Sequence, residues 1–256
     1  MLSKTLTITI LIMAGAAFSG TAYASGRPSN QDDGRVKTEI DRTCQITPGA
    51  KIEVYSISGS VDVESTTGDQ IEIHIVRTAP SQQDLDRARK MLIDCSGSGL
   101  RIREENGSEH RVNTRVALKV PSETPLSLHD INGRVRATRI HAGINLNNIN
   151  GMAQVGDISG SSTISNVNGM VILHIVSLTQ PGLYINNVNG SIEVHIADSV
   201  NANLRAENIG SGLYTDLPNV TIQGRLSSRN FQAQVGAGGP PISISSVNGK
   251  VHISAN

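Results

Sequence analysis

The chain has 256 residues in which 22 basic side chains balance 22 acidic ones, so its formal net charge is zero. Without a basic patch or a long run of one sign, the sequence predicts no nucleic-acid partner. Aromatic residues make up 2% of the chain and Trp is absent, which argues against a lectin-type site built on aromatic anchors.

Residues 1–24 have the three parts of a secretory signal peptide. Lys4 gives the positive first region, residues 6–18 the apolar region, and residues 22–24 the A-x-A cleavage pattern. The apolar run is shorter than a membrane span needs. We therefore expect no membrane span and an exported protein, periplasmic or secreted, whose mature chain begins near Ser25.

A leader and a compact segment are expected next. Residues 25–43 are rich in Gly, Pro, Ser, Asn and mixed charges, a composition that predicts a flexible leader. Residues 44–122 predict a small N-terminal β segment, because five stretches alternate apolar and polar residues. These stretches are 51–56, 60–65, 70–78, 100–104 and 112–120.

One short helix is predicted inside this segment. Ser81 is a suitable N-cap, and Asp84 stands at the third helical position. The apolar stripe of this helix would consist of Leu85, Ala88, Leu92 and Cys95.

The sequence has two cysteines, Cys44 and Cys95, both in the N-terminal segment. In an oxidising compartment such a pair predicts a disulfide, here from the leading strand to the end of the helix. The alternative, two free thiols or a metal pair, lacks supporting ligands in the sequence.

A six-residue phrase recurs along the chain: an apolar residue, any residue, Ser/Asp/Asn, Ile/Val, Asn/Ser and Gly. Its seven copies end at Gly59, Gly133, Gly151, Gly160, Gly169, Gly190 and Gly249. Gly and Asn tolerate the left-handed backbone region, and strand-like alternation follows the copies. Each copy therefore predicts a corner between two strands, with its Ile or Val pointing inward.

The spacing of the corners favours an all-β fold with a single-stack β-solenoid over residues 123–256. The glycines repeat every nine residues from Gly151 to Gly169 and every eighteen from Gly133 to Gly169, which predicts about 18 residues per coil. An antiparallel meander sandwich is the alternative, because Asn-Gly also closes hairpins. The corners are expected to form structural ladders along the stack, made by Asn132, Gly133, Asn150, Gly151, Asn168, Gly169, Asn189, Gly190, Asn248 and Gly249.

The Asn-Gly corners, the entry at Pro121 and the ending at 236–249 together resemble the bacterial putative-adhesin family. The resemblance covers roughly residues 44–256. It implies a β-solenoid domain of unknown function on an exported bacterial envelope protein, with no catalytic residues to carry over. The cysteine pair is not part of that family's pattern.

Motifs for catalysis or for a cofactor are absent from the sequence, which has no G-x-S-x-G, H-E-x-x-H, P-loop or C-x-x-C. No catalytic residue, cofactor or metal ligand is predicted. Asp130 and Asp157 hold the turn-making position of the corner phrase, which favours a structural role. Alternation places three histidines on the polar strand face: His74, His174 and His195. His174 and His195 are expected on neighbouring coils, so a transition metal shared by these two is the alternative to solvent-facing side chains.

Two methionines predict a contact surface. Met152 and Met170 each follow a corner glycine, eighteen residues apart, and Ile172 follows on the same outward face. Neighbouring exposed apolar residues mark a contact surface. The alternative is that the N-terminal segment or residues 213–240 cover them. Self-association through a strand edge of the last coil, near residues 250–254, is a second expected mode of contact.

The sequence as a whole favours a non-catalytic, adhesin-like interaction or scaffold module of the cell envelope. Its partner would be an envelope protein or a surface polymer, whose identity the sequence does not give. The alternative function is a carbohydrate-active enzyme on a β-helix, a lyase or hydrolase, which would need acidic and basic residues gathered on one face.

Overall fold

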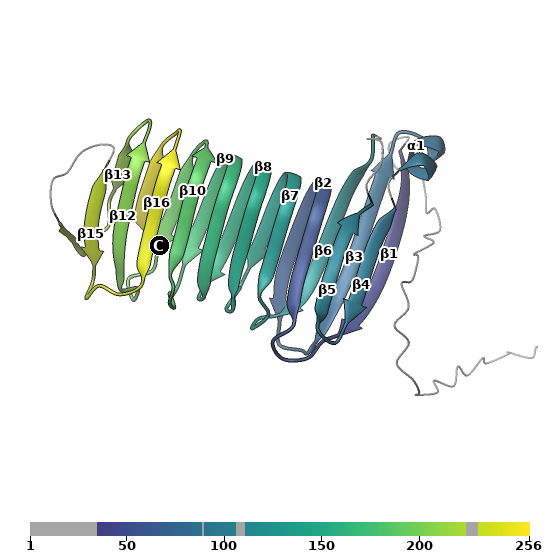
Figure 1. Ribbon diagram of the computed structural model, residues 1–256, viewed down its shortest axis with the longest axis horizontal. Helices are drawn as coiled ribbons and strands as arrows, with labels where there is room; N and C mark the ends of the chain where they lie inside the picture. Colours follow the sequence, from purple (N-terminus) through teal and green to yellow (C-terminus); the bar gives the residue numbers. More distant parts are fainter. Residues whose placement is uncertain (1–34, 89, 106–110, 224–229) are drawn as a thin grey trace, which may run out of the picture.

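The computed structural model describes residues 35–88, 90–105, 111–223 and 230–256 (Figure 1). Within them it contains 17 strands and one short helix, which confirms the all-β class. The expected signal peptide and the first part of the expected leader, up to residue 34, lie outside the described residues. In the described part of the chain, no helix is long and apolar enough to cross a membrane.

The first elements of the chain are β1 Val36–Gln45, β2 Lys51–Thr66, β3 Gln70–Ala79, α1 Gln82–Arg87, β4 Met91–Ser96, β5 Gly99–Glu104 and β6 Asn113–Pro121. They are followed by β7 Leu126–Thr138, β8 Gly143–Ile158, β9 Ser161–Ile175, β10 Leu183–Asn189, β11 Ile192–Ile196 and β12 Ala202–Ile209. The last are β13 Leu213–Thr215, β14 Val220–Ile222, β15 Phe231–Val235, β16 Pro241–Val247 and β17 Val251–Ala255. The five strands expected in the N-terminal segment are present within β2, β3, β5 and β6.

Bent strands stack in parallel and in register. β7 pairs with β8 so that Gly133 lies opposite Gly151, and β8 pairs with β9 so that Gly151 lies opposite Gly169. Each such unit, called a rung below, has a first leg before the Asn-Gly corner and a second leg after it. The pairs β10–β11, β16–β17 and β12–β13 form further rungs of the same kind.

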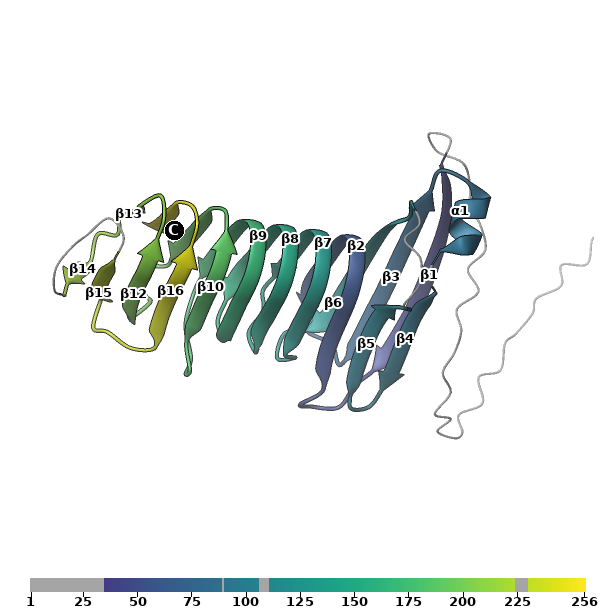
Figure 2. The ribbon, with the colours of Figure 1, turned by 45° about the horizontal axis from the view of Figure 1, so that its top comes forward.

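The order of the rungs differs from the order of the chain (Figures 1 and 2). β2 pairs along both legs with β7, so the hydrogen-bonded network is continuous across residues 122 and 123. The β16–β17 rung lies between the β10–β11 and β12–β13 rungs. The expectation that residues 250–254 form an end edge is therefore wrong, because β17 is paired on both sides. Beyond β12, the sheet of first legs is extended by β15 and then by β14, both through antiparallel pairing.

The core is filled by the alternating inward side chains of both legs, which form one continuous cluster. Its plug at each corner is the Ile or Val of the repeated phrase, as the sequence predicts. Six of these corner residues are each at most 1% exposed: Ile57, Ile131, Ile149, Val167, Val188 and Val247. Burying such branched side chains on strands removes apolar surface from water at about 25 cal/mol per Å².

The left-handed residue of the corner is the third of the phrase, not the Asn beside the glycine. φ is between 53° and 57° at Ser56, Asp130, Asn148, Asp157, Asn166 and Asn187. Short polar side chains tolerate this region because they hydrogen-bond locally. Asp130 and Asp157 thus occupy positions that the turn itself requires.

The corner glycines bring neighbouring backbones into close contact. At Gly133, Gly151, Gly169, Gly190 and Gly249 a Cβ atom would lie 1.7–1.9 Å from the carbonyl oxygen of the glycine on the adjacent rung. At four of them, Gly133, Gly151, Gly169 and Gly190, φ also lies between 143° and 152°, a range that other residues rarely adopt. Only glycine fits this column.

The corner asparagines form a ladder of side-chain hydrogen bonds beside the glycine column. Asn150 Nδ2 donates to Asn132 Oδ1 at 3.1 Å, and Asn168 Nδ2 donates to Asn150 Oδ1 at 3.1 Å. Asn189 donates to Asn168 at 3.0 Å, and Asn248 donates to Asn189 at 3.2 Å. Asn248 joins the ladder although 59 residues separate it from Asn189. The last copy of the phrase therefore stacks on the copy that ends at Gly190.

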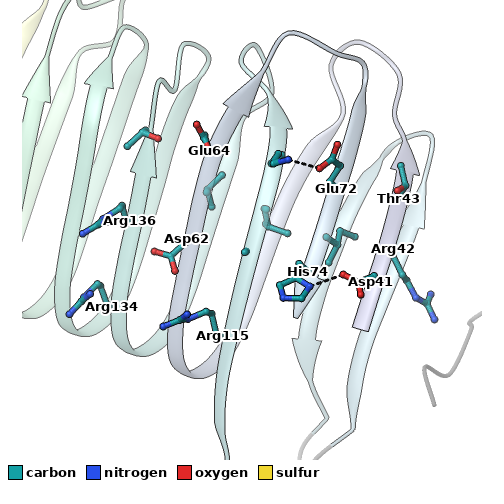
Figure 3. Close-up of a pocket in the computed structure, with 16 residues that line it drawn as sticks. Asp41, Arg42, Thr43, Asp62, Glu64, Glu72, His74, Arg115, Arg134 and Arg136 are labelled. Carbon is teal, nitrogen blue, oxygen red and sulfur yellow. Dashed lines mark hydrogen bonds and ion pairs between the residues drawn. The ribbon is translucent and has the colours of Figure 1, made fainter. Parts of the chain in front are cut away.

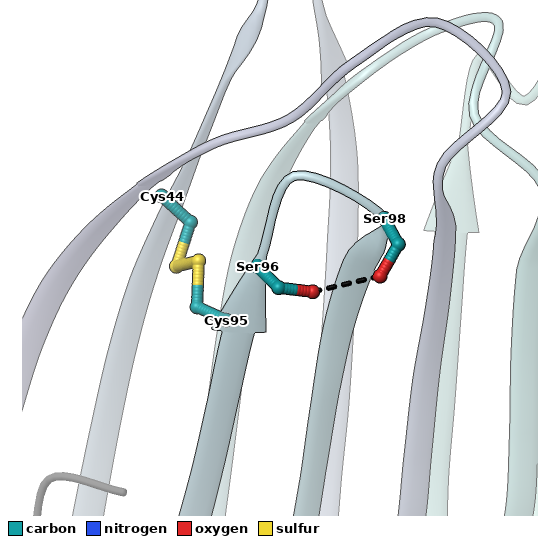
Figure 4. Close-up of a disulfide and its surroundings, with 4 residues drawn as sticks. All are labelled: Cys44, Cys95, Ser96 and Ser98. Carbon is teal, nitrogen blue, oxygen red and sulfur yellow. Dashed lines mark hydrogen bonds between the residues drawn. A yellow bond between two sulfur atoms is a disulfide. The ribbon is translucent and has the colours of Figure 1, made fainter. Parts of the chain in front are cut away.

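The N-terminal end of the stack is a cap of two layers. β5 and then β4 extend the first-leg side of β2, whereas β6, β3 and then β1 extend its second-leg side. The disulfide between Cys44 of β1 and Cys95 of β4 joins the outer strands of the two layers (Figure 4), which confirms the predicted pairing.

Two expectations for this region are wrong. The helix comprises only Gln82–Arg87, with Ser81 as its N-cap, and the residues from Met91 to Ser96 form β4 because they pair with β5 across a tight turn. Leu92 and Cys95 are therefore strand residues. Residues 36–43, expected in the leader, belong to β1, which pairs antiparallel with β3.

Replacing Gly151 by Ala is expected to lower the free energy of unfolding by about 3 kcal/mol or more, because the new Cβ would meet the Gly133 carbonyl oxygen. Gly156→Ala is the matched control on the same strand, since its Cβ would meet Thr138 Cγ2 at an ordinary 3.7 Å. Urea unfolding measures both. Equal stability of the two variants would contradict the close approach.

Removing the disulfide by the double change Cys44→Ala and Cys95→Ala is expected to lower the free energy of unfolding by about 4 kcal/mol, because the bond closes a loop across a sequence separation of 51. Chemical denaturation with and without reductant measures this loss. The reductant should destabilise the wild type and leave the double variant unchanged. A wild type indifferent to reduction would show that the bond does not constrain the unfolded chain.

Candidate functional site

A charged groove with a volume of about 850 Å³ lies on the outer face of the second-leg side. It runs across β1, β3, β6 and the second legs of β2 and β7 (Figure 3). Ten charged or imidazole side chains line it: Asp41, Arg42, Asp62, Glu64, Glu72, His74, Arg115, Lys119, Arg134 and Arg136. We call this surface the charged groove.

The strand register explains how the groove is assembled. Ser60 of β2 lies opposite Arg115 of β6 and Arg134 of β7, and Asp62 lies opposite Ala117 and Arg136 in the same way. The short side chain of Ala117 stands between His74 and Asp62, which leaves space above the sheet at this point.

Three of the four carboxylates that line the groove contact a basic side chain. His74 Nδ1 lies 2.6 Å from Asp41 Oδ1, and Lys119 Nζ donates to Glu72 Oε2 at 2.9 Å (Figure 3). Glu64 accepts a hydrogen bond from Arg139 at the rim. Exposed pairs of this kind contribute little stability, but they leave Asp62 as the one lining carboxylate without a cation in contact among the described residues.

Three arginines surround this carboxylate. Figure 3 shows Asp62 between Arg115 on one side and Arg134 and Arg136 on the other. All three guanidinium groups are exposed, and within the described residues none of them makes a side-chain hydrogen bond or ion pair. The middle of the groove therefore presents three donor-rich cations and one acceptor to solvent, an arrangement suited to carboxylate, sulfate or phosphate groups.

The expected contact patch adjoins the groove on the same outer face. Met152 lies opposite Arg134 in the register, and Met170 lies opposite Met152. Met170 is 36% exposed, whereas Met152 and Ile172 are half-buried. The described part of residues 213–240 pairs with β12 and β17 at the far end of the stack, so it does not pair with the rungs that carry the patch.

The histidines are arranged differently from a metal site. The rings of His174 and His195 stack with centroids 4.5 Å apart and planes at 16°, and Ser254 Oγ lies 2.8 Å from His195 Nδ1. The nitrogen lone pairs lie in the ring planes, so two parallel rings direct them side by side rather than at one ion. In the residues that the structure describes, no three His, Cys, Asp or Glu side chains gather to hold a metal.

The first-leg face carries a smaller charged cluster beside a stacked aromatic pair. Arg101 donates from Nε and Nη2 to Glu53 Oε2 at 2.9 and 2.7 Å, and Tyr55 stacks on His129 at 5.0 Å. The hydrogen bond from Arg101 lowers the pKa of Glu53 below its ordinary value, against a smaller opposing effect of burial. Unlike Arg115, Arg134 and Arg136, Arg101 is thus hydrogen-bonded within the protein.

The charged groove is a candidate surface that sequence reasoning missed. Arg134 and Arg136 alternate after a corner glycine and were recognisable as outward residues. Arg115 belongs to a distant strand, and nothing in its local sequence indicates the parallel pairing of β6 with β2. The patch residues, by contrast, follow directly from the repeat.

The solved structures to which this chain is similar include bacterial proteins described as putative adhesins. A putative cell adhesion protein from Clostridium sporogenes aligns at a TM-score of 0.42 and 12% identity, covering 86% of this chain and 100% of its own. A putative adhesin from Bacteroides fragilis aligns at 0.29 and 12%, covering 86% and 97%. A putative lipid binding protein from Parabacteroides distasonis aligns at 0.27 and 10%, covering 85% and 96%. Scores and identities this low do not say what this chain binds.

No protein-family model and no curated protein matches this chain.

Replacing Arg101 by Gln is expected to raise the pKa of Glu53 toward its ordinary value, because the hydrogen bond and the positive charge of Arg101 are lost. A carboxyl NMR titration measures the shift, and Arg103→Gln on the same strand is the control. Because the folded pKa is depressed, the pair stabilises the protein above the unfolded pKa of about 4.3 and loses this effect as the pH falls through the folded value. An unchanged Glu53 titration in the variant would contradict the assignment.

Proposed function

We propose that this chain is a non-catalytic, adhesin-like interaction module of an exported envelope protein, and that its contact surface is the charged groove with the adjoining methionine patch. The observation that carries the proposal is the group of three exposed arginines without partners in the described residues. Unpaired guanidinium groups beside an exposed apolar residue are typical of a binding surface.

Export is supported by the disulfide, because such bonds persist in oxidising compartments and are rare in the cytosol. The composition of residues 1–24 supports it independently. We further propose that the stacked rungs are coils of a β-solenoid, since parallel in-register neighbours eighteen residues apart repeat from β7 to β9. A rigid stack of this kind would hold the groove and the patch in a fixed relation.

The enzyme alternative is less well supported by the groove. A carbohydrate-active site needs two carboxylates that face each other across the bound sugar, one to transfer a proton and one to attack or to activate water. Asp41, Glu64 and Glu72 each have a basic partner instead. Asp62 alone supplies no such pair, so binding is the activity that the surface supports best.

Blocking the groove is expected to weaken attachment to bacterial cell envelopes, measured by co-sedimentation of the purified protein with envelope fragments. Ala117→Trp would fill the hollow, and Met170→Asp would place a charge on the patch. We expect each to weaken saturable binding several-fold. Ser127→Trp and Thr163→Asp make the same changes on the first-leg face and should bind as the wild type does.

Failure of envelopes to retain the wild type, or equal binding by all four variants, would overturn this proposal. Release of reducing or unsaturated sugars from the envelopes, abolished by Asp62→Asn, would favour the carbohydrate-active enzyme instead.

A further inference from the structure

We propose that the charged groove binds an acidic glycan, a linear polysaccharide whose sugars carry carboxylates and hydroxyl groups, such as a polyuronate. This inference rests on the proposed interaction function and gives the chemical class of its ligand. Its basis is the combination of spaced cations and an unpaired acceptor in the groove.

The spacing of the cations fits a polymer better than one small anion. Arg115 and Arg134 lie on either side of Ser60, so their Cα atoms are two strand spacings apart, roughly 10 Å. Arg136 follows Arg134 by two residues on the same face, roughly 7 Å along the strand. A free phosphate is too compact to reach all three positions, whereas successive charged units of a chain can pair with one guanidinium each.

Asp62, the acceptor between the arginines, indicates that the ligand must also carry hydrogen-bond donors. Asp62 stands opposite Arg136 in the register, yet no ion pair forms between them in the described structure. An ionised carboxylate accepts hydrogen bonds only, so a ligand has to bring donors close to its own anionic groups. A uronic acid ring does so, because it carries hydroxyl groups and a carboxylate on one unit.

Other polyanions fit this surface less well. A nucleic acid or a polyphosphate presents acceptor oxygens along its backbone, and Asp62 and Glu64 would repel them. Single-stranded nucleic acids are bound by aromatic side chains that stack on the bases, and no Phe, Tyr or Trp is among the residues lining the groove. The mixed signs of charge therefore favour a ligand of lower charge density with its own hydroxyl donors.

The first experiment measures binding of a de-esterified oligogalacturonate to the purified protein by isothermal titration calorimetry at low salt. The methyl-esterified form of the same oligomer, which keeps the hydroxyl groups and loses the charge, is the ligand control. We expect the charged oligomer to bind, the ester to bind at least about tenfold more weakly, and added salt to weaken binding.

Variants then assign the contacts. Arg134→Gln and Arg136→Gln should each weaken binding by about tenfold or more, the effect of losing a charge-assisted hydrogen bond. Arg103→Gln, the same change on the first-leg face, should bind as the wild type does. Asp62→Asn discriminates between ligand classes, since it should weaken a glycan whose hydroxyl groups donate to Asp62 and strengthen a polyanion that Asp62 repels.

Equal binding of the charged oligomer and its ester, or arginine variants that bind as the wild type does, would overturn the inference. Tighter binding of inorganic polyphosphate or DNA than of the oligogalacturonate, with affinity raised by Asp62→Asn, would also overturn it. Either result would leave the interaction function standing if envelopes still retain the wild type. Loss of envelope binding by the wild type would remove the proposed function itself.

Discussion

The close approach of backbones at the corner glycines is the constraint on which the rest of the structure depends. A Cβ atom at Gly151 would lie 1.9 Å from the Gly133 carbonyl oxygen, so adjacent rungs can pair in this register only with glycine at the corner. Sliding one rung by a residue would bring a side chain into this column and turn the buried face outward. The glycine column therefore fixes the register, and the asparagine ladder beside it adds hydrogen bonds that depend on the same register.

A fixed register places outward side chains in rows that run along the stack. Most rows on the first-leg face carry Ser, Asn and Thr, whereas the second-leg face carries charges near the cap and methionines further along. The groove exists because β6 and β3 extend that face beyond β2 and bring a small residue, Ala117, to the middle of a charged region. The proposed binding surface thus lies where the repeat meets a segment that does not follow it.

The repeat could be predicted from the sequence because each copy contains the polar residue and the glycine that form its corner. The buried Ile or Val position follows from the same six residues. The order of the rungs could not be predicted in this way. Near-identical phrases can stack on one another in any order, so the place of the 244–249 copy beside Ile185–Gly190 is decided by where the intervening chain crosses. The local pattern was also misleading at Leu92 and Cys95. Their spacing fits the apolar stripe of a helix, but both residues belong to a strand that pairs with β5 across a tight turn.

Arg115, Arg134 and Arg136 differ from Arg101 because they make no side-chain hydrogen bond or ion pair within the described residues. In a parallel in-register sheet, a basic residue commonly has an acidic neighbour one strand away, as Arg101 has in Glu53. Arg136 has the same opportunity with Asp62, yet the two side chains stay apart and both face solvent. Their separation leaves three exposed, donor-rich cations and one acceptor side by side, which is why we propose a ligand that carries both carboxylates and hydroxyl groups.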